Sequence, residues 1–161
     1  MNTENYPASS ASTGYLWFLN SLIHIRLPAS AGRDGISIIE HRVPLGDSPP
    51  LHLHRAEDEI LYILEGDFRF QLNQTQQRAG PGDTLLVPQA TPHTYKAESQ
   101  EGRFLTVTRG GHFERFVRAL ARPAERVALP PPAAPPSPEA LAEFVKVAAS
   151  FGIDLCGPPL Q

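Results

Sequence analysis

Residues 46–66 decide the fold, and they read GDSPPLHLHRAEDEILYILEG. A proline-containing turn precedes His52 and His54, and a short polar turn separates them from Glu59 and the apolar run that follows. Side chains alternate between the two faces of a strand, so His52 and His54 point to the same side, about 7 Å apart at a rise of ~3.3 Å per residue. Glu59 opens the next strand, and its carboxylate can return to the same small volume.

A second segment, residues 82–93, reads GDTLLVPQATPH and brings in another histidine. Two prolines fix the turn before His93, which begins a further strand that can cross opposite the first pair. We expect His52, His54, Glu59 and His93 to converge on one ion. Three imidazole nitrogens and one carboxylate oxygen suit a divalent transition metal (Fe, Mn, Co, Ni, Cu or Zn), whereas Ca²⁺ and Mg²⁺ prefer more oxygen ligands.

Short apolar runs separated by turn residues extend on both sides of these segments and predict an all-β domain, a sandwich or a barrel. The strands expected are Leu16–Leu27, Ile36–Val43, Leu51–His54, Glu59–Leu64, Phe68–Leu72, Thr84–Val87, His93–Lys96 and Phe104–Thr108. The strand at residues 60–64 is apolar on both faces, so another sheet, a helix or a second copy of the chain must cover the outer one. A homodimer is therefore expected.

The periodicity becomes helical after Gly111. Apolar residues spaced three and four apart predict a helix that contains Phe113 and Phe116 and a second one that starts at Ser137–Pro138 and ends near Gly152. Six of the nine residues from 130 to 138 are proline, which predicts a stiff, extended connector between the helices. We expect both helices to pack on the β-domain or on a partner subunit, with a lid over the site as the weaker alternative.

The histidines, the carboxylate and the turn glycines at positions 46, 66 and 82 resemble the two-part signature of the cupin superfamily. The resemblance covers residues 16–108 and implies a small β-barrel, a double-stranded β-helix or jelly roll, in which His52, His54, Glu59 and His93 bind the metal. Two positions depart from the usual pattern, Ala90 where glycine is commonest and Ala97 where asparagine is. The domain boundaries expected are a flexible leader at 1–14, the cupin barrel at 15–110 and the C-terminal helices with the connector at 111–161.

Further motifs are similar to those of bacterial single-domain cupins described as quercetin 2,3-dioxygenase-like. They are residues 49–55, the Gly110–Gly111 step into a helix, and residues 157–160. This likeness implies an oxidoreductase that cleaves a flavonol or a related enolisable aromatic with O₂, with Glu59 as the catalytic base. The alternatives are a cupin isomerase or decarboxylase, and a module that binds a metal or small ligand without turnover.

Aromatic side chains near the site are the candidates for substrate binding: Tyr95, Phe104, Tyr62 and Phe70. Tyr95 shares strand parity with His93, although core filling is the ordinary role of each of these residues. We expect His24 and His41 to be satisfied or solvent-exposed histidines with no ligand role, and Cys156 to be a small buried hydrophobe.

Composition limits the other classes of function. A chain of 161 residues fits one domain, and a net charge of −3 without a basic run argues against nucleic acid as a partner. No stretch has the ~18–20 apolar residues of a membrane span, and no signal peptide is recognisable. The single cysteine suits a reducing compartment, so we expect a cytoplasmic protein.

Overall fold

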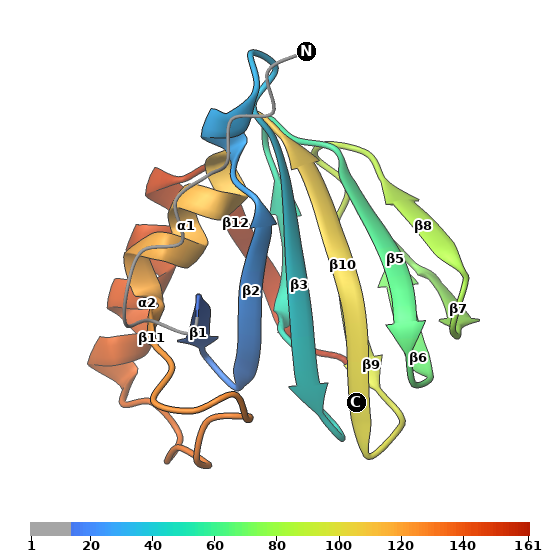
Figure 1. Cartoon of the computed structure of the whole chain (residues 1–161). Coiled ribbons are helices and arrows are strands. Elements are labelled where there is room, and N and C mark those ends of the chain that lie inside the picture. The colour runs from blue at the N-terminus through green and yellow to red at the C-terminus, as the bar shows by residue number, and fades with distance from the viewer. Residues whose placement is uncertain (1–13) are drawn as a thin grey trace.

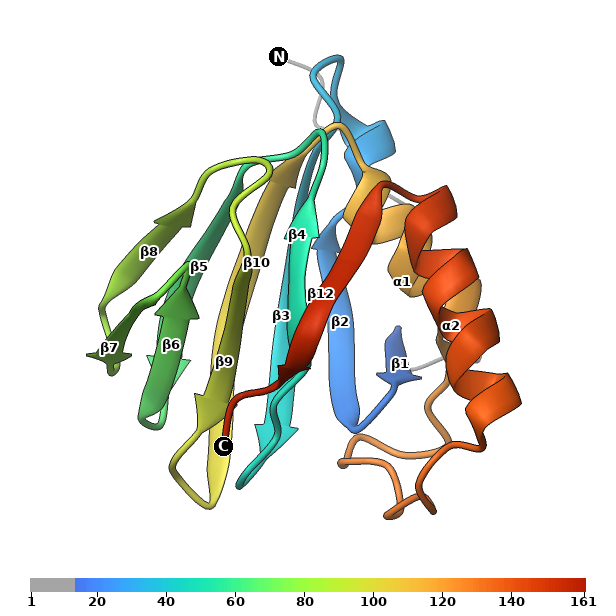
Figure 2. The same ribbon diagram turned by 180° about the vertical axis from the view of Figure 1, so that it is seen from behind.

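The strands form two antiparallel sheets that face one another in a computed structural model, which describes residues 14–161 (Figures 1 and 2). One sheet has seven strands in the order β11 (Arg122–Pro123), β1 (Tyr15–Phe18), β2 (Ser21–Leu27), β3 (Ile36–Pro44), β10 (Glu101–Arg109), β5 (Glu59–Glu65) and β8 (Thr84–Val87). The other has five, in the order β12 (Ile153–Pro159), β4 (Pro50–His54), β9 (His93–Ala97), β6 (Phe68–Leu72) and β7 (Thr75–Ala79).

The mostly β fold predicted from the sequence is confirmed, with differences of detail. Within residues 14–161 the two sheets are hydrogen-bonded separately, so a closed barrel is not confirmed. The expected strand Leu16–Leu27 is a hairpin, β1 and β2, that turns at Leu19 with φ 52°. Three strands were not predicted, β7, β11 and β12. Strand β7 is a polar edge strand, and β12 contains Gly157 and two prolines, which only an edge strand tolerates.

Alternation along the strands places the main core between the sheets. In β5, Leu61 and Ile63 are buried, whereas Ile60 and Tyr62 on the other face are 38% and 39% exposed. The buried residues packed between the sheets are Val43, Leu61, Ile63, Phe68, Phe70, Ala79, Leu85, Val87, Ala97 and Phe104.

Both predicted helices are present, as α1 (His112–Leu120) and α2 (Pro138–Ser150), and a short 3-10 turn, η1, spans Ala29–Ala31. The hydroxyl of Ser137 accepts a hydrogen bond from the Ala140 N–H at 3.2 Å, the N-cap expected from the sequence. The helices lie beside β1 and β2 (Figure 1), and Phe116 and Val117 of α1 pack with Ala148 of α2 in a second core cluster.

The position of the helices bears on what covers the outer face of strand β5, which was predicted to be apolar on both faces. The helices lie at the opposite side of the molecule from β5 and β8 (Figure 2), so they do not cover the outer face of β5. The homodimer expected from that face stays a prediction.

Among the described residues, neither helix is long and apolar enough to cross a membrane. Cys156 is exposed, so the expectation that it is buried was wrong.

The turn glycines of the two motifs have the backbone that the pattern requires. Gly46, Gly66 and Gly82 have φ values of 78°, 82° and 92°, a region that favours glycine. Ala90, at the position where a glycine is commonest, also has a positive φ of 58°. Its N–H donates to the carbonyl of His54 at 2.7 Å, so this strained residue holds the turn before His93 against the strand of the other histidines.

Replacement of Ala90 by glycine is expected to stabilise the fold by about 0.5–1 kcal/mol, because the left-handed conformation costs a residue with a Cβ roughly 1–2 kcal/mol, partly offset by the flexibility of glycine when unfolded. Urea unfolding measures the change. The exposed helical residue Ala142 provides a control, since Ala142→Gly is expected to destabilise by about 1 kcal/mol. A loss of stability in Ala90→Gly would contradict the strain assigned to Ala90.

Candidate metal centre

Three histidines of the five-stranded sheet form one cluster. His52 and His54 lie on β4, and His93 lies on the neighbouring β9, where it is the register partner of His52. The ring centroids are 4.3 Å apart for His52 and His93, and 5.4 Å apart for each of the other two pairs. One nitrogen from each ring lies within 4.8 Å of the other two, so the three side chains are close enough to share a single ion.

Glu59 approaches this cluster from the opposite sheet. It begins β5, and its Oε2 lies 2.8 Å from Nε2 of His93 and 3.9 Å from Nε2 of His54. The sequence placed His93 opposite the first pair, whereas the structure places it beside them and Glu59 opposite. The four residues predicted as ligands thus come together between the two sheets, and His54, Glu59 and His93 are each 5% exposed or less.

Backbone carbonyls orient two of the imidazoles. Nδ1 of His52 donates to the carbonyl of Pro50 at 2.8 Å, and Nδ1 of His93 donates to that of Thr91 at 2.9 Å. A carbonyl oxygen only accepts, so both rings carry a hydrogen on Nδ1. In His52 the lone pair of Nε2 is left for the cluster, whereas Nε2 of His93 forms a hydrogen bond with Oε2 of Glu59. An outer hydrogen bond such as that from Nδ1 is the usual arrangement around a metal-bound histidine.

His54 provides the clearest sign that a cation fits this position. Both of its ring nitrogens are buried, and neither has a hydrogen-bond partner within residues 14–161. An unsatisfied buried polar group costs about 1–3 kcal/mol. Nε2 of His54 faces the carboxylate of Glu59 across a gap of 3.9 Å, and a cation between them would satisfy both groups.

The electrostatics of the cluster agree with this assignment. Burial and the neighbouring rings of His93 and His54 lower the pKa of His52 to about 3, so this imidazole stays neutral. Burial tends to raise the pKa of Glu59, but the three imidazoles lower it to about 2, so the carboxylate is ionised. Burial lowers the pKa of His93, yet the hydrogen bond and charge of Glu59 outweigh this and raise it.

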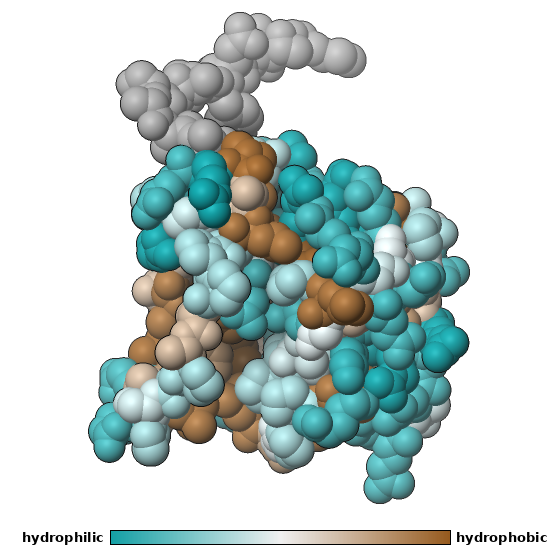
Figure 3. Space-filling model, turned by 90° about the horizontal axis from the view of Figure 1, so that it is seen from below, coloured by the Kyte–Doolittle hydropathy of each residue, from teal (hydrophilic) through white to brown (hydrophobic). Residues whose placement is uncertain are grey.

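A cavity of about 590 Å³ opens onto the cluster. His52, Glu59 and His93 are among its lining residues, and so are Pro135, Pro136 and residues of helix α2. The proline-rich connector and α2 therefore form part of the wall of the cavity. Seen from below, hydrophobic surface gathers on the helix side of this end of the molecule, and the opposite side is mostly hydrophilic (Figure 3).

The aromatic residues predicted to bind substrate fall into two groups. Phe70, Tyr95 and Phe104 line the cavity. Tyr62 is 39% exposed on the outer face of β5 and lies outside the cavity wall, because its strand parity is opposite to that of Glu59. The hydroxyl of Tyr95 donates to Oδ2 of Asp47 at 2.8 Å, which fixes the tyrosine ring in the cavity.

Glu57 has a structural role that the sequence did not indicate, because an acidic turn normally faces solvent. It is 3% exposed, and its two carboxylate oxygens accept the N–H groups of His112 and Phe113 at 2.7 and 2.8 Å. Glu57 therefore caps the N-terminus of α1, where a negative charge is favourable. Its Oε2 also lies 3.8 Å from Nδ1 of His54, so the same side chain connects the helix to the histidine cluster.

Replacement of Glu57 by glutamine is expected to lower the free energy of unfolding by about 2 kcal/mol, because the amide can accept only one of the two N–H groups and carries no charge. Urea unfolding tests this, with the exposed Glu143→Gln of α2 as the control. A stability equal to that of the control would show that Glu57 does not anchor the helix.

Comparison with known proteins agrees with the geometry. The family model of the cupin domain matches residues 39–108, a range that contains all four clustered residues. Quercetin 2,3-dioxygenase of Bacillus subtilis is 32% identical over 104 residues, which cover 64% of this chain. The match spans only 31% of that relative's length.

Solved structures share the fold. A polyketide cyclase, RemF of Streptomyces resistomycificus, is 25% identical with a TM-score of 0.50, over 61% of this chain and 68% of the cyclase. A Thermotoga maritima protein described as a predicted oxalate decarboxylase is also 25% identical, with a TM-score of 0.51, over 55% of this chain and 79% of its own. With the four clustered residues, the matched family model identifies residues 39–108 of this chain as a cupin domain, and these structures share its fold.

Proposed function

We propose that this cupin is a metal-dependent dioxygenase that cleaves a flavonol or a related enolisable aromatic with O₂. The observation that carries the proposal is a cluster of three histidines and Glu59 beside a largely apolar cavity, in which both ring nitrogens of His54 lack a partner among the described residues. The identity to the Bacillus quercetin 2,3-dioxygenase supports the substrate class.

In this proposal His52, His54, His93 and Glu59 hold one divalent transition metal. When bound, the metal would supply Lewis acidity that lowers the pKa of a substrate hydroxyl. Glu59 is the group of this chain that accepts the released proton, because its ionised carboxylate belongs to a residue that lines the cavity. The resulting substrate anion is electron-rich and is itself the reductant of O₂, so the reaction needs no other electron donor.

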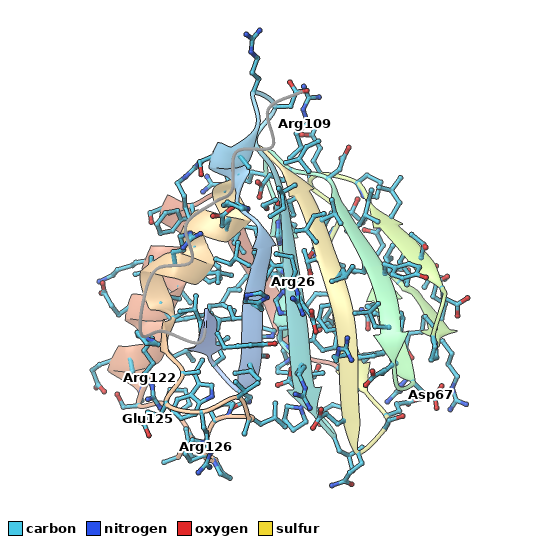
Figure 4. The ribbon with its side chains drawn as sticks, in the orientation of Figure 1. Arg26, Asp67, Arg109, Arg122, Glu125 and Arg126 are labelled. Atoms are coloured by element: carbon cyan, nitrogen blue, oxygen red, sulfur yellow. The ribbon has the colours of Figure 1, made fainter. Side chains whose placement is uncertain are left out.

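The composition of the cavity wall favours a neutral, flat substrate. Among the described residues that line it, none is lysine or arginine. Arg69 pairs with Glu98, and Arg103 pairs with Glu40 and Glu65, so neither of these two strand arginines serves the cavity. The labelled Arg109, Arg122 and Arg126 lie at the periphery of the molecule (Figure 4). A sugar phosphate or a dicarboxylate would find no cationic side chain in the described wall to pair with.

The C-terminal segment after residue 110 contributes a strand to the sheet that carries His52 and His54. The leader expected at residues 1–14 lies, except for Gly14, outside the described residues. Strand β12 pairs with β4, the strand of His52 and His54, although it lies beyond the boundary expected at residue 110. We propose that residues 15–110 build the site together with the C-terminal segment, which supplies a strand as well as the helical wall.

Oxygen uptake with quercetin tests the proposal. The purified protein loaded with each metal in turn is expected to consume O₂ with quercetin, to lose this activity with a chelator, and to regain it when the same metal is restored. Absence of uptake with every metal, for quercetin and for simpler catechols, would refute the dioxygenase.

A second candidate function is ring closure without oxygen, which the likeness to a polyketide cyclase favours. The polyketide cyclase shares the fold at 25% identity, and an apolar cavity beside a metal site also suits ring closure without oxygen. A cupin isomerase or decarboxylase belongs to the same non-oxidative class. Conversion of an aromatic or polyketide substrate under anaerobic conditions would identify this class, whereas affinity without turnover would identify a binding module.

A further inference from the structure

His41 is a buried histidine of the cavity wall that the proposed reaction does not use. It lies on β3, is 5% exposed and lines the cavity. Its Nε2 is buried and has no hydrogen-bond partner within residues 14–161. The sequence predicted a satisfied or solvent-exposed histidine, and the structure shows that His41 is neither.

Two aromatic rings hold the imidazole in place. The His41 ring is stacked on Phe104, with centroids 4.8 Å apart and planes at 6°, and on Phe113 at 6.0 Å and 20°. Phe113 also contacts His54, with ring centroids 5.4 Å apart. His41 therefore lies one aromatic ring away from the metal cluster, in a fixed orientation.

Other polar groups of the cavity wall already have partners in the protein. The Tyr95 hydroxyl donates to Asp47, and the Thr94 hydroxyl donates to the carbonyl of Pro49 at 2.6 Å. His41 differs from them, because it lines the cavity and its Nε2 has no hydrogen-bond partner among the described residues. A buried polar atom left without a partner is unfavourable, so a ligand that supplies the partner gains affinity.

We propose that His41 is a second recognition point of the cavity, which forms a hydrogen bond with an oxygen of the substrate away from the metal cluster. The substrate class rests on the proposed function: a flat, neutral, mostly apolar molecule with two separate oxygen-bearing positions. A neutral imidazole nitrogen can donate to a carbonyl or accept from a hydroxyl, according to its tautomer. The apolar rings of Phe104 and Phe113 beside it suit the aromatic body of such a molecule.

The test uses 2-naphthol and 2-methylnaphthalene, which have nearly the same size and shape and differ in the hydroxyl. Fluorescence titration of the metal-loaded wild-type protein is expected to show that it binds 2-naphthol about tenfold more tightly than 2-methylnaphthalene. His41→Phe should bind the two probes equally within about twofold while retaining its metal, measured by mass spectrometry. His24, which also has an unsatisfied ring nitrogen but lies outside the cavity wall, provides the matched control, and His24→Phe should keep the preference.

A tenfold preference that persists in His41→Phe, or no preference in the wild-type protein, would overturn the proposal. His41→Leu is measured in parallel, so that a folded variant without the polar nitrogen is available if the phenylalanine does not fit. Quercetin-dependent oxygen uptake is recorded on the same wild-type preparation. If His41→Phe lost the preference for 2-naphthol while the wild-type protein consumed no oxygen with quercetin, the role of His41 in recognition would be supported and the dioxygenase would be rejected.

Discussion

His54→Ala is expected to lose its bound metal and to lower catalytic activity by more than about 100-fold while the chain stays folded. Within residues 14–161 neither ring nitrogen of His54 makes a hydrogen bond, so its removal breaks no side-chain hydrogen bond that supports the sheets. The proposed metal, in contrast, would lose one of three imidazole ligands. Metal content by mass spectrometry and a circular dichroism spectrum of the same sample measure the two effects.

The control for this variant is His112→Ala, at the start of α1 and outside the cluster. It is expected to retain one equivalent of metal. If His54→Ala also retained one equivalent, His54 would not be a ligand. Global unfolding of His54→Ala would mean that the residue supports the core.

Glu59→Gln is expected to separate metal binding from proton transfer. The three imidazoles remain, so the variant should retain metal with weakened affinity. The amide cannot accept a proton, so activity should fall by about 10²–10⁴-fold, the usual contribution of general base catalysis. The measurement is turnover of quercetin at saturating metal, with bound metal determined in the same sample.

Glu65→Gln, at the other end of β5 and exposed, is the matched control and should leave turnover unchanged. Wild-type turnover in Glu59→Gln would show that Glu59 is not the base. Complete loss of metal in this variant would make the carboxylate an essential ligand and leave its role as a base without support.

The residues of the cluster could be predicted because the pattern that encodes them is local. Alternation along a strand puts His52 and His54 on one face, and turn residues of fixed type bring Glu59 and His93 back to them. The positive φ values of the motif glycines have the same local origin. The amphipathic helices could also be predicted from their spacing, and α2 begins at the expected cap, Ser137.

The missed features depend on contacts between distant parts of the chain. Glu57 is buried because its carboxylate caps a helix that begins 55 residues later, and nothing near it in the sequence indicates that partner. Strand β12 pairs with β4 across about 100 residues, and its glycine and prolines favour a loop when considered alone. His41 has the inward parity of its strand, but only the packed aromatic rings show that its nitrogen is left without a partner.

Anomalous diffraction from crystals grown with Mn²⁺, Co²⁺ or Ni²⁺ tests the central claim most directly. The predicted result is one strong peak per chain, in contact with the Nε2 atoms of His52, His54 and His93 and with the carboxylate of Glu59. A cluster that shows no peak with any of these ions, or whose nitrogens point away from a common centre, would contradict the account.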